Sequence, residues 1–121
     1  MEYSSNLKKF GTGVSPAEIE ETLAAVCRAL PKNRNEKVYK RCFGAIDLTS
    51  LNSTDSKDRI DRFVTRAVEL PNHYPEVPNV ASVCVYPVFV ETAGMAIGDS
   101  GMSITSVCGG FPSSQTYLEV K

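Results

Sequence analysis

The chain has 121 residues with a formal net charge of −1, and 42% of its residues are hydrophobic. This length favours one domain with a core of its own. Its 13 basic and 14 acidic residues are spread along the chain, which excludes a polycationic surface for nucleic acid and a basic face for membranes.

The first predicted element is an amphipathic helix that follows a polar segment of 14 residues. Ser15 is a suitable N-cap, Pro16 suits the first helical position, and Glu18 completes a capping box. Apolar residues at helical spacing then form one face, and they are Ile19, Leu23, Val26 and Leu30. The segment 31–35, which starts with Pro31, is predicted to break this helix.

A buried strand and a second helix are predicted next. Residues 36–41 lead, through a short helical turn, into a strand at about 43–48. A turn that contains Thr, Ser and Asn follows this strand. A second amphipathic helix is predicted at 55–69, with an apolar face of Ile60, Phe63, Val64, Ala67 and Val68. The segment 70–79 contains three prolines and is predicted to be a loop.

Two further strands follow. Residues 80–86 are nearly all apolar, as expected for a strand of a parallel sheet covered on both faces. A short helix at 89–97 and a third strand at 103–108 come next, and a last helix is predicted to begin at Ser113 or Ser114.

This order of elements indicates an α/β fold with a parallel sheet. One helix precedes three βα units, whose spacing is close to the roughly 30 residues per unit of an eightfold barrel. Apolar strands are poorly suited to the exposed edges of a three-stranded sheet. The sequence therefore predicts part of a larger TIM (β/α)8 barrel.

Asp47 is the first chemical candidate, because ligands of α/β proteins bind at the carboxyl ends of strands. It either serves a catalytic group there or accepts hydrogen bonds from the following turn. Cys84 is either a pocket thiol or a small buried hydrophobe, and Tyr86 either donates to a ligand or caps a core. Gly109 and Gly110 are better explained by a tight turn than by an anion-binding loop.

The cysteines indicate neither a disulfide scaffold nor a structural metal. Cys27, Cys42, Cys84 and Cys108 form no Cys-x-x-Cys pair, and His73 is the single histidine. The first residues lack the apolar segment of a signal peptide, and no run approaches the roughly 18 apolar residues of a membrane span. A reducing, cytoplasmic setting is predicted.

Three motifs follow the predicted strands in chain order. They are Ile46-Asp47-Leu48-Thr49-Ser50-Leu51-Asn52, Val83-Cys84-Val85-Tyr86-Pro87 and Val107-Cys108-Gly109-Gly110-Phe111-Pro112-Ser113-Ser114-Gln115-Thr116. Together they resemble the first three βα units of the deoxyribose-phosphate aldolase family. The resemblance covers residues 43–121, and residues 1–42 resemble the N-terminal helical extension of some family members.

The resemblance implies a TIM barrel that cleaves 2-deoxy-D-ribose 5-phosphate to D-glyceraldehyde 3-phosphate and acetaldehyde. The reaction is of class I, in which a lysine forms a Schiff base with the substrate and no metal or cofactor takes part. It also implies that Asp47 belongs to a polar network near the lysines. The residues implied to line the pocket are Thr49, Leu51, Cys84, Tyr86 and Phe111.

The same resemblance places the Schiff-base lysine on the sixth strand, its companion lysine on the seventh and a proton-relay aspartate on the fourth. The chain therefore resembles an N-terminal portion of the barrel that is inactive alone, with a sugar phosphate or aldehyde as the ligand of the whole enzyme. The alternative is a non-enzymatic interaction module. Such a module would associate with itself or with another chain through exposed strand edges.

Overall fold

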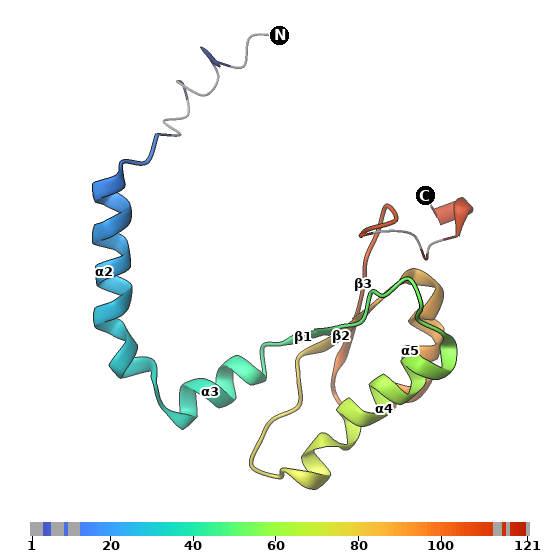
Figure 1. The fold of residues 1–121 in the computed structure, drawn as a ribbon. Helices are drawn as coiled ribbons and strands as arrows, with labels where there is room; N and C mark the ends of the chain where they lie inside the picture. Colours follow the sequence, from blue (N-terminus) through green and yellow to red (C-terminus); the bar gives the residue numbers. More distant parts are fainter. Residues whose placement is uncertain (1–3, 6–8, 10–12, 113–114, 116, 121) are drawn as a thin grey trace. The chain divides into compact units, whose positions relative to one another are not determined.

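The computed structural model describes residues 4–5, 9, 13–112, 115 and 117–120. The chain divides into two compact units, Met1–Asn35 and Glu36–Lys121. Figure 1 traces the helices and strands of both units in chain order. Among the described helices, none combines the length and the apolar character that crossing a membrane requires.

In the first unit, helix α2 (Pro16–Asn33) begins where the sequence predicts. The Ser15 hydroxyl accepts a hydrogen bond from the Glu18 N–H at 3.2 Å, and the Glu18 carboxylate accepts one from the Ser15 N–H at 2.7 Å. This capping box confirms the predicted start. The predicted break at Pro31 is wrong, because proline removes one donor only and the Arg34 N–H still bonds to the Leu30 carbonyl at 3.0 Å.

In the second unit, helix α3 (Glu36–Phe43) confirms the helical turn predicted after residue 36 and extends to Phe43, where the first strand was predicted to begin. Lys40 pairs with Glu36 one turn earlier at 2.6 Å, and this pair favours helix over strand. Strand β1 therefore begins later and covers Asp47–Thr49. Ile46, predicted to be buried, is 38% exposed.

Helix α4 (Lys57–His73) confirms the second predicted helix, with Ser56 as its N-cap. Its apolar face is buried as expected at Ile60, Val64 and Ala67. The helix extends past Pro71, because the Tyr74 N–H still closes the last turn on the Leu70 carbonyl at 3.0 Å. The loop after α4 therefore begins four residues later than the predicted start at residue 70.

Strands β1, β2 (Ser82–Val85) and β3 (Ser103–Ser106) form a parallel sheet in the order β1-β2-β3. Strand β2 is buried at every position, whereas the two edge strands are mostly exposed. The edge strands are shorter and more polar than predicted. Their Asp, Ser and Thr side chains keep their hydrogen-bonding groups accessible to water, which suits an edge position.

Helix α5 (Val90–Ile97) confirms the predicted short helix and follows a 3-10 turn at Pro87–Phe89. Helices α4 and α5 lie on the same side of the sheet (Figure 1). Their buried residues share one core with two residues of β2, and this core includes Ile60, Val64, Ala93, Ile97, Val83 and Val85. The predicted burial of the second strand on both faces is confirmed, since all four residues of β2 are buried, although α4 and α5 pack on one side of the sheet only.

The last predicted helix cannot be compared at its start, since Ser113 and Ser114 lie outside the described residues. Farther along, Leu118–Val120 forms a 3-10 turn. The second unit is thus an α/β arrangement of a small parallel sheet with crossover helices, as expected for a partial βα fold.

Candidate functional site

The face of the sheet opposite α4 and α5 is polar. Parallel pairing places Asp47 beside Ser82 and Thr49 beside Cys84, and successive residues of a strand point to opposite faces. Leu48 and its neighbour Val83 therefore face the helices, while the residues on either side of them face away. The open face carries Asp47, Thr49, Ser82, Cys84, Ser103 and Thr105.

Hydrogen bonds across the open face confirm that these side chains point the same way. The Ser82 hydroxyl donates to Asp47 Oδ1 at 2.5 Å, and the Thr105 hydroxyl donates to Ser82 Oγ at 3.4 Å. A chain of polar groups thus runs from β3 through β2 to β1. Ser82 holds one carboxylate oxygen of Asp47, which leaves the exposed Asp47 side chain with accepting capacity toward solvent.

Cys84 lies in the middle of this face and is buried. Burial, followed by the negative charge of Asp47, raises the pKa of the Cys84 thiol above the ordinary 9.0, and a hydrogen bond with Thr49 opposes the shift in part. The thiol is therefore held neutral at physiological pH. This favours a pocket wall or packing role over a nucleophilic one.

The raised pKa leads to a testable order of reactivity. With iodoacetamide at neutral pH, we expect the exposed Cys27, Cys42 and Cys108 to react first and Cys84 last, because alkylation requires the thiolate and access. The pH midpoint of Cys84 alkylation should lie above 9.0. Because the folded state holds this proton more tightly, the stability it contributes is present below pH 9.0 and is lost as pH rises through the higher folded pKa.

Mass spectrometry of tryptic peptides over a reaction time course would measure these rates. Asp47→Asn should move the Cys84 midpoint downward, since it removes one of the two causes of the shift. Equal rates at all four cysteines would contradict the placement of Cys84 on a packed face.

The other predicted pocket residues take different positions. Tyr86 is fully buried in the core, and its hydroxyl donates to the Leu51 carbonyl at 3.1 Å. Leu51 packs against the same core, and the Thr49 hydroxyl donates to the Asp47 carbonyl at 3.0 Å. Phe111 is 62% exposed. The structure thus brings Asp47, Thr49 and Cys84 together on the open face.

Asp55 organises the loop after β1, although the sequence analysis placed it only at the start of the helix predicted at 55–69. Its side chain is completely buried, and Oδ2 accepts from the Ser50 hydroxyl at 2.8 Å and the Asn52 N–H at 3.0 Å. Oδ1 accepts from the Asn52 side chain at 3.3 Å and lies 3.5 Å from Arg59 Nε. The signal in the sequence was an aspartate three residues after Asn52 and directly before the Ser56 cap.

Gln115 joins the loop after β3 to the loop after β1. Its side-chain amide donates toward three carbonyls, those of Asn52, Ser53 and Asp55, at 3.0, 2.8 and 3.3 Å. The two loops at the carboxyl end of the sheet are therefore tied together. Neither backbone spacing nor residue type alone indicated this contact.

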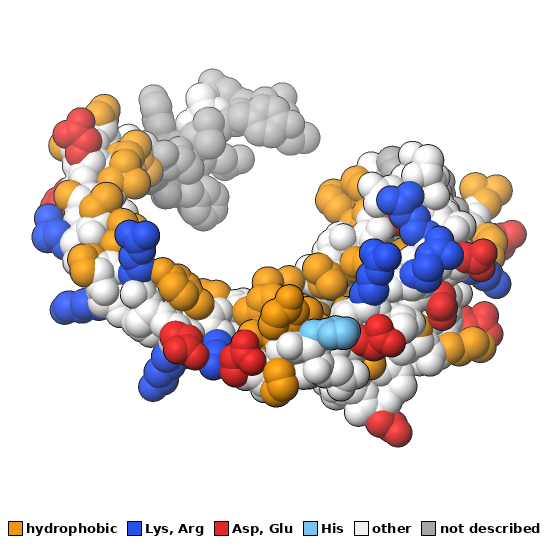
Figure 2. Space-filling model, turned by 60° about the horizontal axis from the view of Figure 1, so that its bottom comes forward, with side chains coloured by type: hydrophobic (Ala, Val, Ile, Leu, Met, Phe, Trp, Pro, Cys, Tyr) orange, Lys and Arg blue, Asp and Glu red, His pale blue; other side chains and the backbone are white. Residues whose placement is uncertain are grey.

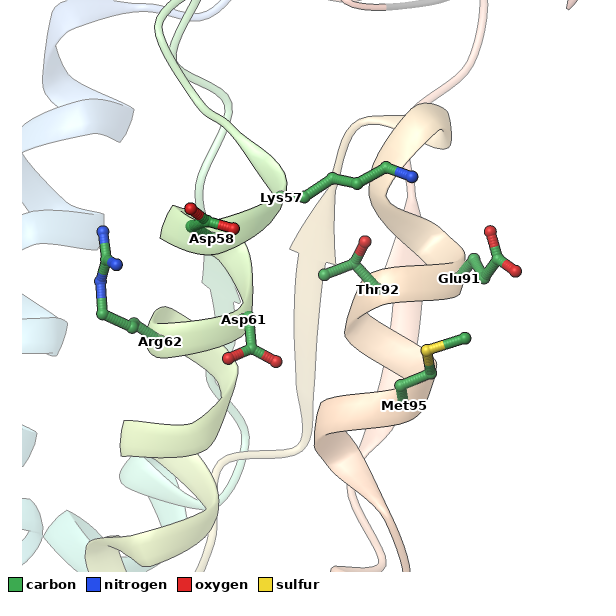
Figure 3. Close-up of a pocket in the computed structure, with 7 residues that line it drawn as sticks. All are labelled: Lys57, Asp58, Asp61, Arg62, Glu91, Thr92 and Met95. Atoms are coloured by element: carbon green, nitrogen blue, oxygen red, sulfur yellow. The ribbon is translucent and has the colours of Figure 1, made fainter.

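A cavity of about 490 Å³ lies between α4 and α5, on the helix side of the sheet. Figure 3 shows its lining, with the Lys57 side chain reaching across from α4 and the Asp61 carboxylate pointing into the space. Its charged groups have mixed signs, and Asp47 is not among them. In the described part of the chain, no cluster of three or more His, Cys, Asp or Glu residues is placed to hold a metal ion.

Comparisons with known proteins find a distant relative of this chain. No protein-family model matches the chain, and no solved structure matches it. A Caenorhabditis elegans protein described as "Putative deoxyribose-phosphate aldolase" is 30% identical over 118 residues, which cover 94% of this chain. The chain spans 38% of that relative's length. By sequence, the chain is therefore a distant and partial relative of a protein named as a deoxyribose-phosphate aldolase.

Proposed function

We propose that this chain supplies three consecutive βα units of a class I deoxyribose-phosphate aldolase. The observation that carries the proposal is the open polar face, on which Asp47, Thr49 and Cys84 converge while both helices cover the other side. In a TIM barrel, helices lie outside and the opposite face of the sheet points inward. The open face would thus become the inner wall of a complete barrel.

In this proposal the whole enzyme cleaves 2-deoxy-D-ribose 5-phosphate to D-glyceraldehyde 3-phosphate and acetaldehyde. The Schiff-base lysine would come from a strand beyond these three, so the chain would be inactive by itself. Asp47, held by Ser82, would present its free oxygen to the polar network around that lysine. The four free cysteines suit the cytoplasm, where thiols stay reduced.

A chimera tests the proposal. This chain would replace the matching segment of the Caenorhabditis elegans relative, and acetaldehyde release from 2-deoxyribose 5-phosphate would be measured. We expect the chimera to be active and Asp47→Asn to lower kcat by about 100-fold, as for loss of a group in proton transfer. The control is Asp58→Asn, an exposed carboxylate of α4 on the helix side of the sheet and away from the open face, which should leave kcat unchanged.

The isolated chain completes this experiment. Borohydride reduction with the same substrate should leave its mass unchanged, because no strand position of the described sheet is a lysine. A folded but inactive chimera, or full activity of the Asp47→Asn chimera, would contradict the proposed role.

The two sheet edges favour a second candidate, a module that pairs through strand addition. Strands β1 and β3 each have one neighbour among the described residues. Their outer backbone groups could pair with another chain or a second copy. Prolines placed at Thr49 and Ile104, whose backbone N–H groups point away from β2, would abolish such pairing.

A further inference from the structure

Ser82 is a polar residue in a buried position. It begins the central strand β2, where it is 8% exposed, and the rest of that strand is Val83, Cys84 and Val85. Burying a hydroxyl costs free energy unless the group is hydrogen-bonded, and an apolar residue would fill the same position without that cost. The Ser82 hydroxyl is hydrogen-bonded, because it lies 2.5 Å from Asp47 Oδ1 on the neighbouring strand.

The carboxylate fixes the direction of the hydrogen bonds around Ser82. A carboxylate only accepts, so the single proton of the Ser82 hydroxyl points to Asp47. The Thr105 hydroxyl, 3.4 Å from Ser82 Oγ, is therefore the donor in the second contact. The bond to Asp47 is short and charge-assisted, whereas the contact with Thr105 is long and weak. Ser82 thus holds Asp47 directly, and Thr105 orients the Ser82 hydroxyl.

The Asp47 carboxylate depends on this one contact. Asp47 is the only charged residue of the three strands, and the ion pairs found in α3 and at the start of α4 do not include it. In the view of Figure 2, Lys and Arg side chains of this unit are grouped with Asp and Glu side chains to one side of His73. Within the described residues, Ser82 donates the one side-chain hydrogen bond that the carboxylate accepts. Without it, the exposed Asp47 side chain would move among its rotamers.

We propose that Ser82 is a positioning residue for Asp47 in the aldolase reaction and that Thr105 acts through Ser82. The inference rests on the proposed function, in which Asp47 serves the polar network around the Schiff-base lysine. Ser82 holds one carboxylate oxygen, so the other oxygen keeps a single position from which it accepts. The effect falls on kcat rather than on KM, because a positioned group lowers the barrier of the reaction without adding a contact to the bound substrate.

The rotamer of Asp47 tests the first step without any activity. In the isolated chain, NMR couplings between Hα and the two Hβ atoms of Asp47 report whether the side chain keeps one rotamer or moves among several. We expect one rotamer in the wild type, averaging in Ser82→Ala, and one rotamer again in Ser82→Thr, which keeps the hydroxyl. Averaging in the wild type, or a single rotamer in Ser82→Ala, would overturn the proposal.

Kinetics of the chimera described above test the second step. We expect Ser82→Ala to lower kcat by about 10-fold with KM unchanged, and Ser82→Thr to restore most of kcat. Ser103→Ala is the matched control and should leave kcat unchanged. It removes an exposed hydroxyl beside Ser82 on β3, and within the described residues this hydroxyl makes no hydrogen bond to Asp47. A rise in KM without a change in kcat, or no rescue by Ser82→Thr, would contradict a positioning role.

A double-mutant cycle shows whether the residues act through one another. In an Asp47→Asn chimera, Ser82→Ala should lower kcat no further. Thr105→Val changes an exposed side chain, so the fold should tolerate it. It should lower kcat by about 3-fold in the presence of Ser82 and have no effect in Ser82→Ala, as for loss of a weak hydrogen bond.

The outcomes separate this inference from the proposed function. Full activity of the Asp47→Asn chimera would contradict the proposed function, and the role of Ser82 with it. A loss of kcat in Asp47→Asn without a loss in Ser82→Ala would overturn only the role of Ser82. Additive losses for Asp47→Asn and Ser82→Ala would overturn it as well, because they would mean that Ser82 does not act through Asp47.

Discussion

Val83→Asp is expected to unfold the unit Glu36–Lys121. Val83 is fully buried on the face of β2 that packs against α4 and α5, and it belongs to the core shared by both helices. A carboxylate there would be unpaired and removed from water, which costs more than about 4 kcal/mol at neutral pH. A unit of this size has a total stability of about 5 kcal/mol or slightly more, so little folded protein should remain.

Amide chemical-shift dispersion and urea denaturation would measure this loss. Thr105→Asp is the control, because it introduces the same carboxylate on the open face, where Thr105 is exposed. Its cost should stay below about 1 kcal/mol. If both variants lose the same stability, the assignment of the two faces would be wrong.

Asp55→Ala is expected to lower the free energy of unfolding by about 3 kcal/mol. The buried Asp55 carboxylate accepts hydrogen bonds from Ser50 and from the backbone and side chain of Asn52. Truncation leaves these donors without an acceptor in a site that excludes water. Asp55→Asn should lower the free energy of unfolding by less, because the amide oxygen can still accept a hydrogen bond. Some loss should remain, because the NH2 group cannot accept from the other donors.

Urea denaturation with matched m-values would give these differences. Asp58→Ala, three residues along in the first turn of α4, removes an exposed carboxylate and should cost only about 0.5 kcal/mol through the helix dipole. Equal losses for Asp55→Ala and Asp58→Ala would mean that the loop after β1 does not depend on the buried carboxylate.

The helices could be predicted well because their signals are local. Ser15 and Glu18 lie within one turn of each other, and the apolar positions of α4 repeat within its own length. The predicted helix ends were wrong because the position of a helix end depends on the hydrogen bonds of its last turn. Pro31 and Pro71 lie in last turns that need only one remaining hydrogen bond, so neither ends its helix.

The strands and the site were harder to predict. In β1 the polar residues Asp47 and Thr49 alternate with the apolar Leu48. Three residues are too few to distinguish this alternation, which is typical of a strand with one exposed face, from a fully buried strand. Asp47 and Cys84 could be named from their positions, but the Ser82 bond to Asp47 depends on the register between β1 and β2. The Gln115 contact joins segments 60 or more residues apart, and sequence patterns carry no signal for it.

The matching of strand order to chain order has a consequence for folding. Each strand of the second unit pairs with its neighbour in the chain, at a separation of 35 residues between Asp47 and Ser82. Parallel pairing over such a separation closes a loop that contains a whole helix, so it forms more slowly than helical contacts. The sheet can therefore grow in chain order, with β1, α4 and β2 forming a first unit onto which α5 and β3 add.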